Sequence, residues 1–201
     1  MLNKIYKDSL LYLNIAKDYA NTRGINQMEC GYLPILTHNA QTYTDMLLIP
    51  IRDSLKEIVA LECRSITRKE HLKISTKQTH YMLYNIHNAL SNLDYVIVCE
   101  GVFDCVSLTQ LGFNAVATLG ANTTTIQKHA LSVFKNIFIA LDNDKVGIKS
   151  SNDLVRFYSQ FYDVNAELLK YQGKDLNEAL LNDSQKLLQS IQQQLNEIEC
   201  A

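Results

Sequence analysis

From residue 94 onward, short apolar runs alternate with amphipathic segments of helical length, and this alternation restricts the chain to few folds. Runs typical of strands lie at 95–99, 115–118, 137–141 and 164–169, with helical segments between them at about 103–111, 123–133 and 147–161. Strands that alternate with helices of this length form a parallel sheet with right-handed crossovers. The sequence therefore predicts an α/β fold here, a parallel sheet flanked by helices.

Acidic residues follow three of these four predicted strands. Glu100 directly follows the first strand, with Asp104 one helical turn later; Asp142 and Asp144 follow the third, and Asp175 follows the fourth. Ligands of open parallel sheets bind at the carboxyl ends of the strands, so we expect these side chains to gather at one edge. Carboxylates that crowd together repel one another, and a hard divalent cation such as Mg²⁺ or Mn²⁺ relieves that repulsion. The set predicts a metal site.

Each carboxylate also has a structural interpretation. An aspartate after a strand is commonly a helix N-cap, and Asp144 precedes a predicted helix that starts near Val146. Asp104 lies where a negative charge stabilises the first turn of its helix. Both interpretations stay open on the sequence alone.

Charge is divided unequally between the two halves of this chain of 201 residues. Residues 1–92 carry 11 Lys and Arg against 8 Asp and Glu, whereas residues 93–201 carry 8 against 13. The basic excess is concentrated in one segment that contains Arg64, Arg68, Lys69, Lys73 and Lys77. Such a cluster is either a solvated face or a contact surface for phosphates.

Other classes of protein fit the sequence poorly. No apolar run reaches the roughly 20 residues that a membrane span needs, and the polar residues of the first segment do not fit a signal peptide, so we expect a cytoplasmic protein without a membrane partner. The five cysteines are widely spaced, which fits neither a disulfide framework nor a zinc ribbon.

The first half is predicted to be a small α+β unit. Apolar residues recur at helical spacing over 5–23, residues 46–51 and 58–62 are typical of a hairpin around Asp53 and Ser54, and residues 80–91 are typical of a helix.

The run VIVCEGVFDCVSLTQLGFNAVATLGANTT, followed by IFIALDNDKVGIKSS and GKDLNEAL, resembles the TOPRIM domain of bacterial-type and phage-type DNA primases. It contains that family's EGxxD, ATLG and DxDxxG segments. Upstream, YANTRGI, GYLP, LLIPIRDSLKEIVALECRS and LYNIHNAL resemble the basic subdomain that precedes TOPRIM in those primases. The resemblance implies a Rossmann-like TOPRIM domain at 93–180, a basic N-terminal subdomain at 1–92 and a C-terminal amphipathic helix at 181–201. It extends to neither a zinc-binding nor a helicase domain.

The resemblance also implies roles for individual residues. Glu100, Asp142 and Asp144 match catalytic, metal-binding positions, and Asp104 and Asp175 match further acidic positions around the metal. Arg64 and Lys73 fall where the family has basic residues that handle template or nucleotide, and the same role is expected of their basic neighbours Arg68, Lys69 and Lys77. Gly101 and Gly120 match glycines of loops that line the active face.

The implied function is metal-dependent synthesis of short primers on single-stranded DNA from nucleoside triphosphates during replication, by a primase-type nucleotidyltransferase. Two alternatives stay open: a TOPRIM nuclease that uses the same carboxylates, and a non-catalytic DNA-binding accessory of phage or plasmid replication. A helicase or a partner bearing a zinc module would fit a core of this kind. In the tail, the apolar residues at helical spacing are Leu188, Ile191, Leu195 and Ile198. This stripe either packs on its own domain or docks to a partner.

Overall fold

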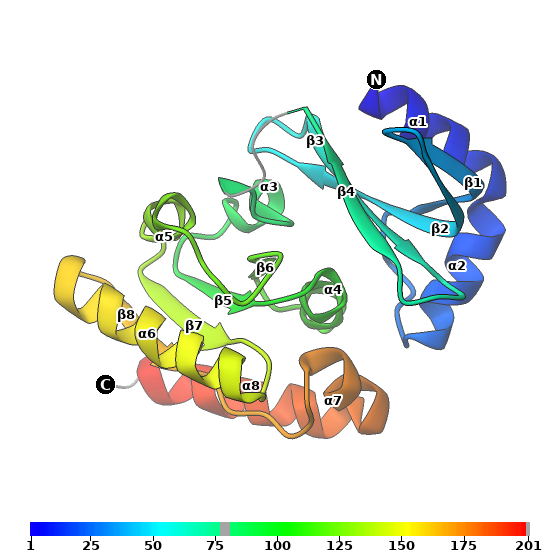
Figure 1. Cartoon of the computed structure of the whole chain (residues 1–201). Coiled ribbons are helices and arrows are strands. Elements are labelled where there is room, and N and C mark those ends of the chain that lie inside the picture. Colours follow the sequence, from blue (N-terminus) through cyan, green and yellow to red (C-terminus); the bar gives the residue numbers. More distant parts are fainter. Residues whose placement is uncertain (77–80, 200–201) are drawn as a thin grey trace. The chain divides into compact units, whose positions relative to one another are not determined.

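The computed structural model describes residues 1–76 and 81–199, and it divides into two compact units, residues 1–79 and 80–201 (Figure 1). The sequence predicted a boundary at residue 92 instead. Within the part of the chain that the structure describes, no helix combines the length and apolar character needed to cross a membrane.

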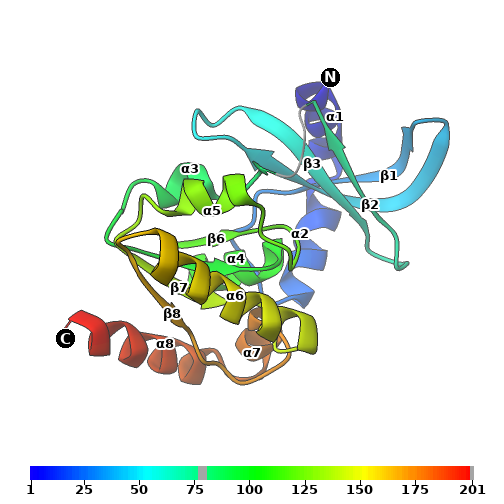
Figure 2. The same cartoon turned by 60° about the vertical axis from the view of Figure 1, so that its left-hand side comes forward.

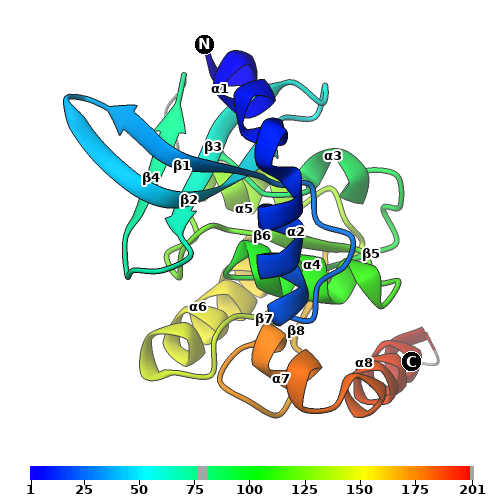
Figure 3. The ribbon, with the colours of Figure 1, turned by 90° about the vertical axis from the view of Figure 1, so that its right-hand side faces the viewer.

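The first unit contains a four-stranded antiparallel sheet with helices against it (Figure 3). Its strands are β1 (Gly31–His38), β2 (Gln41–Arg52), β3 (Ile58–Ser65) and β4 (His71–Ser75), in that spatial order. Helices α1 (Leu2–Ser9) and α2 (Leu13–Thr22) are separated by a 3₁₀ turn, η1 (Leu10–Tyr12), so the single helix expected over 5–23 is interrupted. Leu2 and Tyr6 of α1 pack on Leu48, Leu61 and Ile74 of the sheet.

The second unit is a four-stranded parallel sheet, as the alternation of strands and helices predicted. Strands β5 (Tyr95–Cys99), β6 (Ala115–Ala117), β7 (Asn136–Ala140) and β8 (Asn165–Leu168) lie in the order β6-β5-β7-β8. They alternate with α4 (Val102–Gln110), α5 (Thr125–Leu131) and α6 (Lys145–Phe161), and α7 (Leu176–Asn182) and α8 (Ser184–Glu199) follow β8. Each predicted strand and helix of this half is present, with ends shifted by a few residues.

Helices cover both faces of this sheet because successive side chains of a strand point to opposite sides (Figure 2). Ile97 and Cys99 face the core formed with α4, α7 and α8, whereas Val96 and Val98 face the core formed with α5 and α6. Ile191 of α8 is fully buried in the first of these cores, so the helix packs on its own unit.

The helix expected over 80–91 is largely wrong. Only α3 (Ile86–Ala89) is helical, and residue 80 lies outside the described residues. Tyr84 instead pairs with Ala117 at the edge of the sheet, where the Tyr84 N–H donates to the Ala117 carbonyl at 2.9 Å and the Ala117 N–H donates back at 3.2 Å. The outer edge of β6 thus forms hydrogen bonds with the segment around Tyr84, although the spacing of apolar residues in that segment is typical of a helix.

Candidate functional site

The carboxyl ends of β5 and β7 bring the predicted acidic residues into one region of the second unit. Glu100 follows β5 directly, and Asp142 and Asp144 flank Asn143 after β7. The Asn143 N–H donates to the Lys174 carbonyl at 2.8 Å, which fixes the loop before Asp175 beside the Asp142–Asp144 turn. The sheet therefore gathers these carboxylates as the topology predicted.

Two of the carboxylates cap helices, as their structural interpretation proposed. One oxygen of Asp144, Oδ1, accepts the N–H groups of Val146 and Gly147 at 2.9 and 2.8 Å and so begins α6. Asp175 begins α7 in the same way, accepting the Glu178 N–H on Oδ1 at 2.7 Å. Each residue uses Oδ1 for its cap, and Oδ2 accepts no hydrogen bond from the described residues.

Asp104 is buried, and both of its carboxylate oxygens accept backbone hydrogen bonds. The residue is 7% exposed, and Oδ2 accepts the Gly101 N–H at 3.2 Å while Oδ1 accepts the Asn177 N–H at 3.0 Å. The Asn177 side chain in turn donates to the Ser107 hydroxyl at 3.0 Å. Asp104 thus ties the turn after Glu100 to the start of α7.

Gly147 allows α6 to approach the acidic turn closely. A Cβ at this position would lie 2.1 Å from the Asp142 carbonyl oxygen, well inside van der Waals contact. Helix α6 therefore packs its first turn directly on the backbone of Asp142. The glycine of the DxDxxG segment is required by this contact.

Three of the acidic residues have raised pKa values, and burial is the largest cause for each of them. Burial and the charges of Asp142, Asp144 and Asp104 raise the pKa of Glu100 to about 7, although an N–H of Ala121 lowers it in part. Burial raises the pKa of Asp104 to about 6, opposed by its backbone hydrogen bonds. The pKa of Asp142 is also raised, first by burial and then by Asp175 and Asp144, with Lys174 acting in the opposite direction.

This donor set fits a hard divalent cation, because unpaired carboxylate oxygens that repel one another favour such an ion. Among residues 1–76 and 81–199, however, no three His, Cys, Asp or Glu side chains stand close enough to hold one ion as they are oriented. Glu100, Asp142 and Asp144 would have to turn toward one another around the metal.

The predicted basic residues lie together in the first unit, on β3, β4 and the turn between them. Arg64 is paired in register with His71, and Glu62 with Lys73, so these side chains share one face of the strand pair. An open hollow of about 590 Å³ is lined by Arg64, Arg68, Lys69 and His71, together with the acidic residues Glu62 and Glu70. Lys73 does not line the hollow, but it forms an ion pair at 3.6 Å with Glu62, which does. Lys77 lies outside the described residues.

The sequence did not indicate three residues that organise these regions. Asn177 is 1% exposed and links α7 to α4, but nothing in the segment GKDLNEAL predicts that this asparagine is buried. Asp45 and Thr67 join β2 to the turn between β3 and β4 through a hydrogen bond of 3.1 Å. An aspartate within a strand-like run is a weak signal of an irregular backbone, and only the structure identifies its partner.

The chain is similar to DNA primases. Residues 97–180 match the Toprim-like family. The DNA primase of Mycoplasma genitalium is 28% identical over 96% of this chain, and that of Pseudomonas putida KT2440 is 31% identical over 58% of it. The chain spans about a third of the length of the first relative (32%) and 20% of the second.

Solved structures agree on the fold. The catalytic core of E. coli primase matches with a TM-score of 0.76 at 19% identity, over 96% of this chain and 77% of that one. A structure described as the DnaG primase catalytic domain bound to ssDNA matches with a TM-score of 0.73 at 20% identity, over 96% and 76% of the two chains. The predicted resemblance to the TOPRIM domain and basic subdomain of DNA primases is confirmed by these matches, and with it the predicted fold class.

Proposed function

We propose that this chain, whose TOPRIM-type domain and preceding basic unit match DNA primases, is a nucleotidyltransferase core that synthesises short primers on single-stranded DNA during replication. The observation that supports this most is that Glu100 directly follows β5, and Asp142 and Asp144 follow β7, at the carboxyl edge of the parallel sheet. Nucleoside triphosphates are the second substrate, and we place the reaction in the cytoplasm. A helicase or a partner with a zinc module would complete the proposed assembly.

In this proposal Asp142 and Asp144 hold a divalent cation together with Glu100, and Asp175 adds its second oxygen from the neighbouring loop. Bound Mg²⁺ or Mn²⁺ would supply Lewis-acid stabilisation of the triphosphate charge. Asp104 holds the turn at Gly101 through its hydrogen bond to that N–H.

Glu100 is assigned to take a proton from the attacking 3′-hydroxyl, because it follows β5 directly at the carboxyl edge of the sheet. The hydroxyl oxygen then bonds to the α-phosphorus, and pyrophosphate leaves with the electron pair of the broken bond. Gly101 and Gly120 are assigned to the loops that line the nucleotide site. At Gly120, whose φ is 149°, no atom of the described residues beyond its two chain neighbours lies within 4 Å of where a Cβ would be, so this loop leaves room for the nucleotide. A Cβ at Gly101 would lie 2.7 Å from Asp104 Oδ2, so this glycine serves the contact with Asp104.

The basic face of the first unit would bind phosphates of the template or the incoming nucleotide. Arg64, Arg68, Lys69 and Lys73 are assigned this role, and so, from the sequence alone, is Lys77. Binding of this kind is governed by charge and weakens as salt increases.

A primer-synthesis assay tests the proposal, with purified protein, single-stranded DNA, labelled nucleoside triphosphates and Mg²⁺ or Mn²⁺. Asp142→Asn removes one charge from the acidic edge with little change in volume. The matched control is Asp153→Asn, the same change at an exposed position of α6, where the carboxylate pairs with Arg156 at 3.7 Å. We expect short labelled products from the wild type and the control and none from Asp142→Asn.

Two results would contradict the proposal. Cleavage of the DNA without synthesis would identify a nuclease that uses the same carboxylates. Neither synthesis nor cleavage by a folded protein that binds DNA would identify a non-catalytic accessory.

A further inference from the structure

The turn between β3 and β4, residues 66–70, is fastened to strand β2 at an unusual backbone position. Asp45 interrupts β2 with a positive φ of 57°, a conformation that aspartate tolerates better than most residues. Its carbonyl accepts the Ile66 N–H at 2.9 Å. A strained residue inside a strand persists only where its surroundings hold it, and such positions gather at functional sites.

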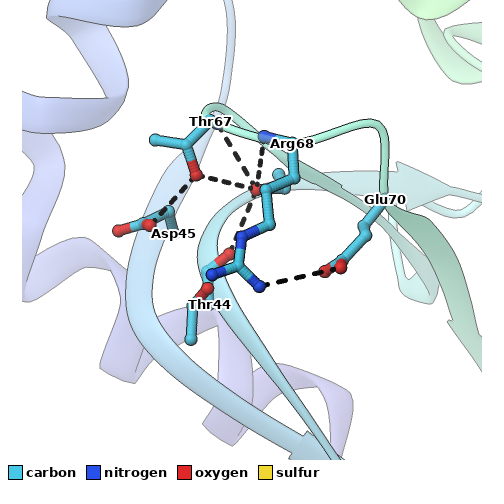
Figure 4. A network of polar contacts seen from close by, with 6 residues as sticks. Thr44, Asp45, Thr67, Arg68 and Glu70 are labelled. Carbon is cyan, nitrogen blue, oxygen red and sulfur yellow. Dashed lines mark hydrogen bonds and ion pairs between the residues drawn. The ribbon is translucent and has the colours of Figure 1, made fainter.

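The carboxylate of Asp45 then holds the turn from its side chain (Figure 4). Oδ2 accepts the Thr67 hydroxyl at 3.1 Å, and Oδ1 accepts the Tyr32 hydroxyl at 2.7 Å. These two hydrogen bonds, with the charge of Arg68, lower the pKa of Asp45, so the carboxylate stays ionised. Both of its oxygens are satisfied by neutral hydroxyl groups.

Ser65 completes the network below the turn. Its hydroxyl donates to the Thr44 carbonyl at 3.2 Å and accepts the Arg68 N–H at the same distance, 3.2 Å. The backbone of Arg68 is thereby fixed, while its side chain is 61% exposed and only loosely paired with Glu70 at 3.9 Å. The turn therefore has a rigid backbone and projecting cationic side chains.

We propose that Asp45 and Thr67 are positioning residues that hold the turn 66–70 in the shape in which Arg68 and Lys69 bind phosphates of single-stranded nucleic acid. This inference rests on the proposed function and adds to it the device that shapes the binding surface. The hollow of about 590 Å³ beside the turn is lined by Thr67, Arg68 and Lys69, so the fastened residues and the cations belong to one surface.

The charge of Asp45 makes the proposal sharply testable. A carboxylate close to Arg68 weakens the attraction of this surface for phosphates, so simple electrostatics predicts that removing it strengthens binding. If Asp45 positions the turn, its removal weakens binding instead. Electrostatics alone and positioning of the turn therefore predict opposite changes in binding affinity for Asp45→Gly.

The experiment measures binding of a fluorescent single-stranded oligonucleotide to the full chain at several salt concentrations. Asp45→Gly removes the carboxylate and leaves a residue that adopts the positive φ without strain. Thr67→Val removes the hydroxyl at constant charge and nearly constant shape, and Thr67→Ser restores the hydroxyl. Tyr32→Phe removes only the second hydrogen bond to Asp45, and thermal unfolding of each variant reports whether it is folded.

We expect Asp45→Gly and Thr67→Val to bind about 5- to 10-fold more weakly, with the salt slope reduced by roughly 0.7 for each phosphate that the protein no longer neutralises. Thr67→Ser should bind like the wild type, and Tyr32→Phe should be weakened about 2-fold, since a neutral hydrogen bond is worth little net free energy.

Wild-type or tighter binding by folded Asp45→Gly would overturn the inference, as would unchanged binding by Thr67→Val or a failure of Thr67→Ser to restore it. Absence of binding by the wild type at low salt would overturn the proposed function together with the inference. A wild type that binds and variants that bind equally well would overturn the inference alone.

Discussion

Replacing Gly147 by alanine tests whether the contact between α6 and the acidic turn positions the candidate site. The new Cβ would lie 2.1 Å from the Asp142 carbonyl oxygen, 2.9 Å from its carbonyl carbon and 3.0 Å from its nitrogen. Three rigid backbone atoms cannot give way as a side chain does, so α6 and the turn must move apart by about 1 Å. We expect this overpacking to cost about 1–3 kcal/mol of unfolding free energy.

The same displacement moves Asp142 and Asp144 relative to Glu100. A misplacement of about 1 Å typically lowers the rate of a positioned reaction on the order of 100-fold, so Gly147→Ala should remain folded and lose most of its primer synthesis. Ile148→Ala, at a neighbouring position of α6 that is 51% exposed, is the control and should keep both stability and activity. Primer synthesis by Gly147→Ala at the wild-type rate would refute the reasoning.

Two further predictions follow from burial and charge. In metal-free protein the pKa values of Glu100 (about 7) and Asp104 (about 6) are raised by folding. Above about pH 4 the folded state therefore binds more protons than the unfolded state, and the free energy of unfolding should fall as the pH rises toward 7. Thermal unfolding of the wild type and of Glu100→Gln across this pH range measures the effect, and the variant should lose less stability than the wild type. An equal or larger loss in the variant would contradict the raised pKa of Glu100. Ile191→Ala removes a fully buried side chain of α8 and should destabilise the second unit by about 2–5 kcal/mol in urea unfolding, whereas an unchanged midpoint would show that α8 does not pack there in solution.

The second unit was predictable because its pattern is local and repeated. Each buried parallel strand is an apolar run, and the acidic residues sit where such runs end, so the sheet edge followed from topology alone. The positions of Glu100, Asp142 and Asp175 at that edge were therefore predictable from the sequence.

The first unit was less predictable because its outer strands lack that pattern. Strand β1 contains Pro34, which suits an edge strand, and β4 is only five residues long. Both pair with adjacent strands across short turns, His38 opposite Gln41 and Arg64 opposite His71, but the side chains of neither strand alternate regularly between buried and exposed. Tyr84 pairs instead with Ala117, which is distant in sequence, and this pairing replaced the expected helix.

The structural and metal-binding interpretations of the acidic residues do not exclude one another, because each carboxylate oxygen has two lone pairs. Asp104 is buried and accepts an N–H on each oxygen, so its carboxylate holds the turn after Glu100. Asp144 and Asp175 cap their helices with Oδ1 alone. A helix cap of this kind fixes the carboxylate in place and leaves Oδ2 without a hydrogen bond from the described residues, so capping is compatible with the metal-binding role that we propose. The sequence left the helix-cap and metal-ligand interpretations open because it shows only which residues are acidic. The structure shows which oxygen atom of each carboxylate accepts the hydrogen bonds of the cap.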